Sequence, residues 1–465
     1  MRVLFVSQYA DPALTGGNNN VYRQAKALKQ DLGVDVEILT WPDSDGWSGP
    51  SPTLEAPNKY SHMNWAYKGL HYHVVKLPQL LLERVLKDSD WQEAVTIGCE
   101  LLAQINPNIV HLQHWRGFSW ILESAKRLSI PTVYTSHDWG LGCLRTILVK
   151  GEGGLCDGSV NVDKCTECVW KGRNLIGKAN ELLVSTATGE RLLGTLERHS
   201  SIGHWLSKHG AVKLGLRKRV SLNFQRAKAI LSNLSAIIVP SAFAKDYYLQ
   251  FGIPSRRIHV EPWYYDLTVP IDSTRADHEK VVLGYVRRIS PEKGVARIFE
   301  ALLSDSLANP IHLVIAGAIQ GEYAEKLHSK FPGNVGKHSI EWMGWIPHHD
   351  IHKFYEKVDA VIIPSEWMDN TPLSLIESIA FKRPVIISDI PSVRDLVQEG
   401  RTGYLTKFNS TQSIEQVIKW VRLRPEALFQ MRRNIPAVKS SVAYASVLKD
   451  LYESLVTSSV PVRSI

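Results

Sequence analysis

The sequence predicts an α/β protein with two Rossmann-like, doubly wound parallel-sheet domains that face a central cleft. The first observation behind this prediction is the length of 465 residues, which is more than one hydrophobic core usually holds. The second is the alternation of short apolar runs with amphipathic helical patterns, which is typical of parallel α/β layers. The third is a polar stretch without periodicity, residues 266–280, after which the same alternation starts again.

The N-terminal domain is assigned to residues 1–265. Short apolar runs bounded by polar positions predict its buried strands at residues 2–7, 34–40, 108–113, 131–136 and 236–241. Helical patterns at 20–32 and 118–128 lie between these strands. Residues 266–280, which follow this domain, are the expected linker.

The C-terminal domain is assigned to residues 281–425. The same reasoning predicts its strands at residues 281–286, 311–317, 360–365 and 384–389. Residues 426–465 are expected to form helices that pack back on the N-terminal domain. Open parallel sheets bind ligands beyond the carboxyl ends of their strands, so a ligand in the cleft would be contacted from both domains.

Composition and motifs argue against several classes of protein. The chain is 44% apolar and 22% charged, as in ordinary globular proteins. No run approaches the ~18 apolar residues of a membrane-spanning helix. The N-terminus shows no small-residue cleavage site, so a cytoplasmic location is expected. Neither domain has a G-x-G-x-x-G loop after its first strand, and no Walker A motif occurs, which argues against nicotinamide and flavin dehydrogenases and P-loop enzymes.

The net charge of +8 is concentrated in a basic segment, residues 198–245, which holds nine Lys or Arg and no Asp or Glu. Apolar residues interleave with these charges. Two interpretations stay open: a solvated basic face, or docking on an anionic membrane surface, which would place the protein peripherally on the inner face of the membrane. No nucleic acid partner is expected, because no recognised binding motif accompanies the charge.

The stretch PSEWMDNTPLSLIESIAFKRPVI, residues 364–386, contains a predicted helix start directly after a buried strand. Asn370 or Thr371 is suited to cap the helix, and Pro372 to be its first residue. The free N–H groups of such a start, from Asn370 to Leu373, would bind a phosphate.

Two acids, Asp369 and Glu377, stand eight positions apart on either side of this helix start. Glu377 lies too far inside the helix to cap it. We therefore interpret its carboxylate as an acceptor for hydroxyl groups, for example those of a ribose. A structural acid on a helix face is the alternative.

A basic loop, GYVRRISPEKG at residues 284–294, follows the first strand of the second domain. Its cations Arg287, Arg288 and Lys293 would neutralise a diphosphate, and Gly294 closes the loop. A solvated loop is the alternative interpretation.

In the N-terminal domain, glycines and histidines follow the predicted strands at the end that would face the cleft. Gly16 and Gly17 lie between the first strand and the first helix, where they would allow close approach of a ligand or form a plain turn. His137 ends a strand at the expected cleft and is suited to contact sugar hydroxyls or phosphate. His111 and His114 are candidates for the same rim.

Four of the five cysteines, Cys143, Cys156, Cys165 and Cys168, fall in one insert that is rich in Gly and polar residues. The C-x2-C pair with two further thiols predicts a structural zinc site, which would stabilise a segment that builds little core of its own. Unligated thiols and a disulfide pair are the open alternatives.

Taken together, these motifs resemble the retaining glycosyltransferases of family 4 (glycosyl transferases group 1), which have the GT-B fold and use nucleotide-diphosphate sugars. The resemblance extends from residue 1 to about residue 455. The family's E-x7-E pattern falls on Asp369 and Glu377, its R-x4-K pattern on Arg288 and Lys293, its glycine pair on Gly16 and Gly17, and its "HD" on His137 and Asp138. The sequence departs from the family at Asp369, where Glu is usual, and at EPWYYD, residues 261–266, where Trp263 and Tyr264 are available for stacking.

The resemblance implies roles for these residues. Glu377 would hold the ribose of the donor, and Asp369 with the amides from Asn370 to Leu373 would hold the sugar and diphosphate. Arg288 and Lys293 would offset the charge that develops on the leaving diphosphate, and His137 would lie beside the sugar.

The resemblance further implies transfer with retention, without a catalytic metal, from a nucleotide-diphosphate sugar to a glycan or lipid-linked acceptor. A UDP-sugar is favoured, and surface polysaccharide biosynthesis is the implied pathway. The alternative function is a catalytically silent GT-B protein that binds nucleotide sugar or glycan. A sugar-nucleotide epimerase is a third interpretation, for which no pair of carboxylate bases is evident.

Overall fold

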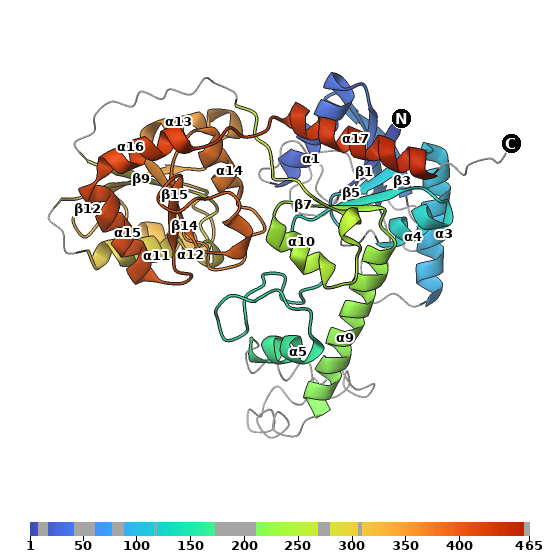
Figure 1. The fold of residues 1–465 in the computed structure, drawn as a ribbon, viewed down its shortest axis with the longest axis horizontal. Helices are drawn as coiled ribbons and strands as arrows, with labels where there is room; N and C mark the ends of the chain where they lie inside the picture. The colour runs from blue at the N-terminus through green and yellow to red at the C-terminus, as the bar shows by residue number, and fades with distance from the viewer. Residues whose placement is uncertain are drawn as a thin grey trace.

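The computed structural model describes residues 1–7, 17–40, 61–76, 88–115, 117, 119–172, 211–267, 280–305 and 309–459. Two mixed but mainly parallel sheets, each flanked by helices, form two domains that lie next to each other (Figure 1). The predicted fold class is confirmed. Most of the expected linker, residues 268–279, and the first part of the basic segment, residues 198–210, lie outside the described residues.

The first sheet has the strand order β3-β4-β2-β1-β5-β6-β7-β8, and all neighbours are parallel except β3 and β4. Its strands are β1 (Arg2–Val6), β2 (Asp35–Thr40), β3 (Ser61–Tyr67), β4 (Leu70–Lys76), β5 (Ile109–Leu112), β6 (Thr132–Thr135), β7 (Ala236–Val239) and β8 (Ile258–Val260). The helices in this part of the chain are α1 (Gly17–Lys26), η1 (Ala27–Asp31), α3 (Asp88–Ile105), α4 (Ser119–Arg127), α5 (Val162–Lys171), α9 (Ala211–Ser232), α10 (Ala242–Leu249) and η2 (Ser255–Arg257).

The second sheet has the order β11-β12-β10-β9-β13-β14-β15, and only β11 and β12 are antiparallel. Its strands are β9 (Val282–Val286), β10 (His312–Ala316), β11 (Asn334–Val335), β12 (His338–Gly344), β13 (Ala360–Ile363), β14 (Val385–Ser388) and β15 (Gly403–Thr406). The accompanying helices are η3 (Pro291–Lys293), α11 (Val295–Leu303), α12 (Glu322–Lys330), η4 (His348–Asp350), α13 (His352–Lys357), α14 (Leu373–Ala380), η5 (Pro391–Val393), α15 (Thr411–Leu423) and α16 (Pro425–Asn434).

The last helix, α17 (Ser441–Ser459), returns to the first domain, whereas α16 packs on the second sheet. Tyr444 and Tyr452 of α17 are fully buried among side chains of β1, α1 and η1. The hydroxyl of Tyr452 lies 2.6 Å from Nδ1 of His111 in β5. Figure 1 shows α17, in red, lying along the blue elements of the first domain.

The helix α9 and the insert around α5 form an arm that projects from the first sheet (Figure 1). Leu216 and Val220 of α9 are buried against Val169 of α5. These apolar residues of the basic segment therefore hold the arm together and do not face solvent. Among the described helices, none combines the length and apolar character that a membrane crossing requires.

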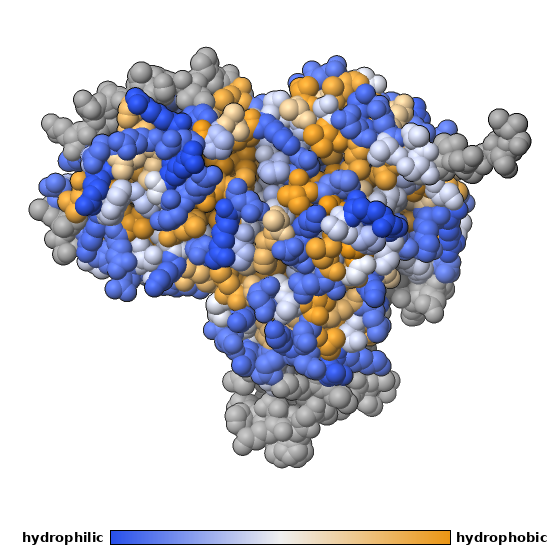
Figure 2. Space-filling view, in the orientation of Figure 1, coloured by the Kyte–Doolittle hydropathy of each residue, from blue (hydrophilic) through white to orange (hydrophobic). Residues whose placement is uncertain are grey.

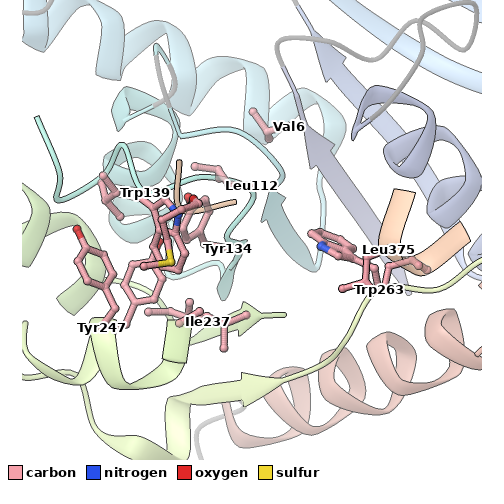
Figure 3. Close-up of a cluster of buried hydrophobic side chains, with 14 of the residues drawn as sticks. Val6, Leu112, Tyr134, Trp139, Ile237, Tyr247, Trp263 and Leu375 are labelled. Atoms are coloured by element: carbon pink, nitrogen blue, oxygen red, sulfur yellow. The ribbon is translucent and has the colours of Figure 1, made fainter. Parts of the chain in front are cut away.

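One buried cluster includes side chains of both domains. Trp139 and Tyr247 of the first domain belong to it together with Leu375 of α14 (Figure 3). Indole and phenol rings bury large apolar areas, so this cluster contributes strongly to holding the domains together. The domains meet along a notch in the molecular outline, visible at the top of Figure 2.

Candidate active site

The site is built where the winding of the second sheet reverses direction. The chain leaves β9 toward β10 on one side and leaves β13 toward β14 on the other, which makes the space beyond β9 and β13 a topological switch point. The loops after these strands touch: the N–H of Glu366 donates to the carbonyl of Glu292 over 3.0 Å. Gly294, at φ +74°, is required here, because a Cβ would meet the Pro364 carbonyl oxygen at 1.8 Å.

Asp369 lies at the centre of this junction in a closed ion network. One carboxylate oxygen accepts from Arg287 at 2.7 Å and from Ser365 at 2.5 Å, and the other accepts from Lys293 at 3.0 Å. The side chains of Arg287 and Asp369 are each 6% exposed. The Lys293 ammonium also lies over the Trp367 ring, 4.1 Å from its centroid.

The network fixes the ionisation of its members. Burial alone would raise the pKa of Asp369, but the charges of Arg287 and Lys293 lower this pKa to about 2. Burial, followed by the charge of Arg287, lowers the pKa of Lys293 to about 8. The negative charge of Asp369 is therefore already balanced by the neighbouring positive charges of Arg287 and Lys293.

Arg288 is placed differently from its neighbour Arg287. Its side chain is 71% exposed and pairs with Glu292 over 2.7 Å. The arginine that the sequence motif singles out is thus the one that remains accessible at the mouth of the site. Its long side chain needs only to leave one exposed ion pair, of the kind worth ~0–1 kcal/mol, to contact an anion.

The start of α14 differs in detail from the expected cap. The helix begins at Leu373, and Pro372 takes the capping position with no side-chain cap, so the prediction of Asn370 or Thr371 as cap and Pro372 as first residue is wrong. Asn370 is used otherwise: its amide donates to the Ser136 carbonyl over 2.6 Å, across the domain boundary. Thr371 donates to the carbonyl of Asn370.

Several buried polar atoms around the start of α14 have no partner within the described residues. They are Nε1 of Trp367, Oδ1 of Asn370, Oγ of Ser374 and Nε2 of His348. An unsatisfied buried polar group costs roughly 1–3 kcal/mol, so four of them around one helix start indicate a place for a polar ligand.

Glu377, one turn into α14, lies in a pocket of aromatic and basic side chains. Tyr355 donates to its carboxylate over 3.1 Å, and Nδ1 of His348 lies 3.9 Å away. Burial raises the pKa of Glu377 to about 7, although the Tyr355 hydrogen bond and the charge of Arg23 oppose this. Burial also lowers the pKa of His348 to about 4.

The first domain reaches this pocket through α1. Gly17 is the first residue of α1, and Gly16 lies outside the described residues. Arg23, further along α1, lies over the Tyr265 ring at 5.8 Å and acts electrostatically on Glu377. Both domains therefore contribute charge beside Glu377.

His137 lies between two parallel rings at the end of β6. Its ring stacks on Trp263 at 4.9 Å and on His114 at 5.2 Å, and its Nε2 lies 2.9 Å from the Gln113 amide oxygen. Burial lowers the pKa of His137 well below its usual value, so the imidazole is neutral. The placement of His111 at the rim is wrong: it is fully buried, bonded to Thr135 and Tyr452, and its pKa falls to about 3 through burial.

A clamp from the first domain holds the loop of Asp369. Nε1 of Trp139 donates to the Met368 carbonyl over 2.6 Å, and the N–H of Met368 donates to the Ile147 carbonyl over 3.0 Å. Together with the bond from Asn370 to Ser136, this clamp fixes the peptides on both sides of Asp369.

The four insert cysteines lie on the other side of this clamp. All five cysteines of the chain are free thiols, so the disulfide alternative is wrong for this structure. Cys143, Cys156, Cys165 and Cys168 line a common cavity of about 370 Å³.

The sequence predicts Arg288, Lys293, Asp369 and Glu377 as site residues but does not predict two further participants. Arg287, predicted as a cation for a diphosphate, is instead buried and paired with Asp369. Arg23 and Ser136 act from the other domain, and no local pattern marks them.

Comparison with known proteins agrees with this architecture. A family model described as glycosyl transferases group 1 matches residues 271–437, and one described as glycosyl transferase 4-like domain matches residues 15–159. Among solved structures, a sucrose-phosphate synthase from Thermosynechococcus elongatus superposes with a TM-score of 0.62 at 15% identity, covering 98% of this chain and 99% of its own. Anabaena HepE in complex with UDP superposes with a TM-score of 0.59 at 15% identity, covering 98% and 100%.

The fold and the matched families define a two-domain GT-B protein. The chain belongs to the group 1 glycosyltransferases. It is 29% identical over 187 residues to a lipopolysaccharide 1,2-N-acetylglucosaminetransferase of Salmonella typhimurium, covering 37% of this chain and 49% of that protein. It is 25% identical over 173 residues to an alpha-D-kanosaminyltransferase of Streptomyces kanamyceticus, covering 36% and 44%. The chain thus spans about half the length of these curated relatives.

Proposed function

We propose that the protein transfers a glycosyl group, with retention, from a nucleotide-diphosphate sugar to a glycan or lipid-linked acceptor in surface polysaccharide biosynthesis. A UDP-sugar is the favoured donor. One observation supports this most: the loop of Arg288 and Lys293 and the helix of Glu377 both follow strands at the switch point of the second sheet, where four buried polar atoms have no partner among the residues that the structure describes. The presence of UDP in the HepE structures supports the donor class by analogy.

In this proposal the diphosphate lies between the basic loop and the start of α14. Lys293 and Arg288 face the charge that builds on the diphosphate as the sugar–phosphate bond breaks. Preorganised groups of this kind are each worth roughly 3–4 kcal/mol of transition-state stabilisation. Because these two cations supply the charge in this proposal, no catalytic metal is required, and added Mg²⁺ or Mn²⁺ is expected to leave the rate unchanged.

Asp369 acts through its neighbours in this scheme. Since Arg287 and Lys293 already hold its carboxylate, it is not available as a covalent nucleophile. In this proposal the acceptor hydroxyl attacks the anomeric carbon from the same face that the diphosphate leaves, so the configuration of the sugar is retained. The hydroxyl proton passes to the leaving phosphate. The role of Asp369 is to orient Lys293.

Glu377 is placed to accept hydrogen bonds from the ribose hydroxyls, and His137 lies on the opposite side, near the sugar. Residues 344–347 follow β12 beside this site and are the proposed contact for the base. Trp345, 57% exposed, is the aromatic residue there on which a base can stack.

The test is a thermal-shift and turnover experiment. UDP, GDP, ADP and CMP are added to wild type, Glu377→Ala and Arg288→Ala, with Arg256→Ala as a surface control. A ligand at a hundredfold excess over its Kd stabilises the folded state by about 2.7 kcal/mol. We expect one nucleoside diphosphate, UDP, to stabilise wild type and Arg256→Ala but not Glu377→Ala.

Turnover separates the enzyme from a catalytically silent relative. Nucleotide release from UDP-sugars in the presence of glycan and lipid-linked acceptors is expected for wild type and is expected to be lost in Arg288→Ala, which still folds. Nucleotide binding without release under any condition would favour the silent protein. Near-wild-type activity in both site variants would show that the site is elsewhere.

A further inference from the structure

The insert between β6 and α9 brings its four cysteines to one place by three separate turns of the chain. Cys143 follows the Trp139 turn, and its N–H donates to the Trp139 carbonyl over 2.9 Å. Cys156 follows a short loop closed by the bridge between Val149 and Leu155.

Cys165 and Cys168 lie one turn apart on α5, which the Asn161 side chain caps by accepting from the N–H of Lys164. Residues three apart share a face of a helix, so both thiols point to the same side.

Backbones approach closely around this cavity, so the arrangement is specific. A Cβ at Gly151 would meet the Cys168 carbonyl oxygen at 2.1 Å, and a Cβ at Gly172 would meet the Arg145 guanidinium. Leu144, Phe224 and Tyr247 line the same cavity, so apolar side chains and thiols share its wall.

Two of the thiols make hydrogen bonds of their own. The Cys165 thiol donates to the Ser159 carbonyl over 3.7 Å and the Cys168 thiol to the Val149 carbonyl over 3.9 Å.

No three of the described thiols have sulfur atoms within 4.8 Å of one another, whereas Glu37, His71 and His73 form a group of that kind. In the latter group the Glu37 carboxylate lies 3.5 Å from Arg2 and bonds to His73. In the thiol group, all four cysteines line one cavity.

We propose that Cys143, Cys156, Cys165 and Cys168 bind one zinc ion that closes this cavity. Four thiolates at Zn–S distances of ~2.3 Å form the usual tetrahedral structural site. Binding releases the protons of the ligating thiols and draws the cavity walls inward, by rotation of the side chains away from the Ser159 and Val149 carbonyls.

The charge around the cavity is mixed. Four cations line it, Arg145, Lys150, Lys164 and Lys171, together with three acids, Glu152, Asp157 and Glu167. Lys164 pairs with Asp157 over 3.4 Å and Lys171 with Glu152 over 2.7 Å, so Arg145 and Lys150 are the remaining lining cations to offset the net charge of −2 of zinc with four thiolates. Nε of Arg145 is buried and has no partner within the described residues, and in the proposed site it would donate to a ligating sulfur. Hydrogen bonds of this kind to ligating sulfurs stabilise metal sites.

The zinc site would also act on the proposed donor site. The segment from Trp139 to Ile147, with Cys143 inside it, holds both backbone groups of Met368, next to Asp369. Fixing Cys143 therefore fixes the loop that orients Lys293. This second part of the inference rests on the proposed function, whereas the zinc site itself does not.

The first experiment measures zinc in protein purified without chelators. We expect about one zinc per chain in wild type and in the control Cys99→Ser, whose thiol lies in α3 outside the cluster, and a loss of at least half of this zinc in Cys165→Ser and in Cys168→Ser. Reconstitution of the apo protein with Co²⁺ is expected to give the absorption of tetrahedral thiolate-bound cobalt in wild type. Zinc below about 0.2 per chain, or equal zinc in all variants, would overturn the site.

The second experiment compares UDP affinity in wild type, Cys165→Ser and Cys99→Ser, each checked for folding by circular dichroism. We expect Cys165→Ser to bind UDP at least fivefold more weakly, and removal of zinc from wild type to do the same. Unchanged affinity in a zinc-free variant would overturn the coupling and leave the zinc site standing. Absence of UDP binding in wild type that contains zinc would overturn the proposed function alone.

Discussion

At the scale of single residues, Asp369 stands where the sequence resemblance leads one to expect Glu. The shorter side chain is held between Arg287 and Lys293, with Ser365 as a further donor. Arg287 stands directly before Arg288, so this pair of arginines divides two tasks: one is buried and structural, and the other is exposed and free to meet a ligand.

We predict that Asp369→Ala lowers the free energy of unfolding by about 3–5 kcal/mol, because it leaves two buried cations without a counter-charge. Urea denaturation measures this loss. Adding Arg287→Met to Asp369→Ala should recover part of it, since one of the unpaired charges is then removed. The control Asp246→Ala, at an exposed position of α10, should stay within about 0.5 kcal/mol of wild type. A loss below about 1 kcal/mol in Asp369→Ala would contradict this network.

The ionisation of Glu377 leads to a pH dependence of donor binding. Its pKa of about 7 means that the carboxyl is mostly protonated at pH 6 and mostly ionised at pH 8. In the proposed site the ionised form accepts hydrogen bonds from the ribose hydroxyls, so this group should make affinity rise with pH, by up to about tenfold over this range. Loss of the Lys293 charge, with a pKa of about 8, opposes this rise toward pH 8. UDP-glucose is the suitable probe, because its diphosphate has no group that titrates near pH 7.

Calorimetric titration at pH 6, 7 and 8 checks this expectation. Glu377→Gln should bind more weakly and lose the rise in affinity between pH 6 and 7, whereas Arg256→Ala should retain the wild-type profile. An equal slope in Glu377→Gln would assign the titration to another group.

The sequence identified the residues that carry motif signals and missed those that act through space. The resemblance to the spaced motifs of a known family marked Arg288, Lys293, Asp369 and Glu377. Arg23 and Ser136 could not be found in this way, because their roles depend on the approach of one domain to the other. His111 was misplaced because a strand end does not reveal whether α17 will cover it.

At the scale of elements, strands with continuous apolar runs were predictable, and those with polar sequences were not. β3 reads SHMNWAY and pairs antiparallel at the edge of the first sheet, so it lacks the pattern of a buried parallel strand. The start of α14 was predicted one position too early, because Pro372 ends the preceding extended segment instead of opening the helix.

The helix α9 carries the described part of the basic segment, and its apolar residues Leu216 and Val220 are turned toward α5. Leu222 of the same helix is 44% exposed, whereas the positions of Arg217, Lys218 and Arg219 supply exposed charge, so a membrane contact of this helix would be mainly electrostatic. We expect the protein to bind vesicles that contain anionic lipid and to dissociate from them as the salt concentration is raised. It should not bind zwitterionic vesicles.

Vesicle flotation with two charge-reversed variants tests this expectation. Lys218→Glu with Lys228→Glu should reduce binding, and the matched pair Lys326→Glu with Lys330→Glu on α12 of the other domain should not. If both double variants bind the vesicles equally well, the basic residues of α9 do not contact the membrane and form a solvated face.

At the scale of the whole molecule, the two domains share a buried cluster and three backbone or side-chain bonds around Asp369. We therefore expect a single cooperative unfolding transition. Far-UV circular dichroism and tryptophan fluorescence should give coincident denaturation curves. Two separated transitions would mean that the shared cluster contributes little to joining the domains.

The path of the chain has a consequence for engineering. The second domain leaves the first through residues 261–267 and returns through residues 435–441, and these two segments lie side by side: the N–H of Tyr265 donates to the Lys439 carbonyl, and Lys439 pairs with Glu261. Topologically, the second domain is an insertion within the first. A chimera with one junction in residues 261–267 and the other in residues 435–441 would therefore carry the second domain of a relative. The recipient would keep its own first domain, including α17 and the arm.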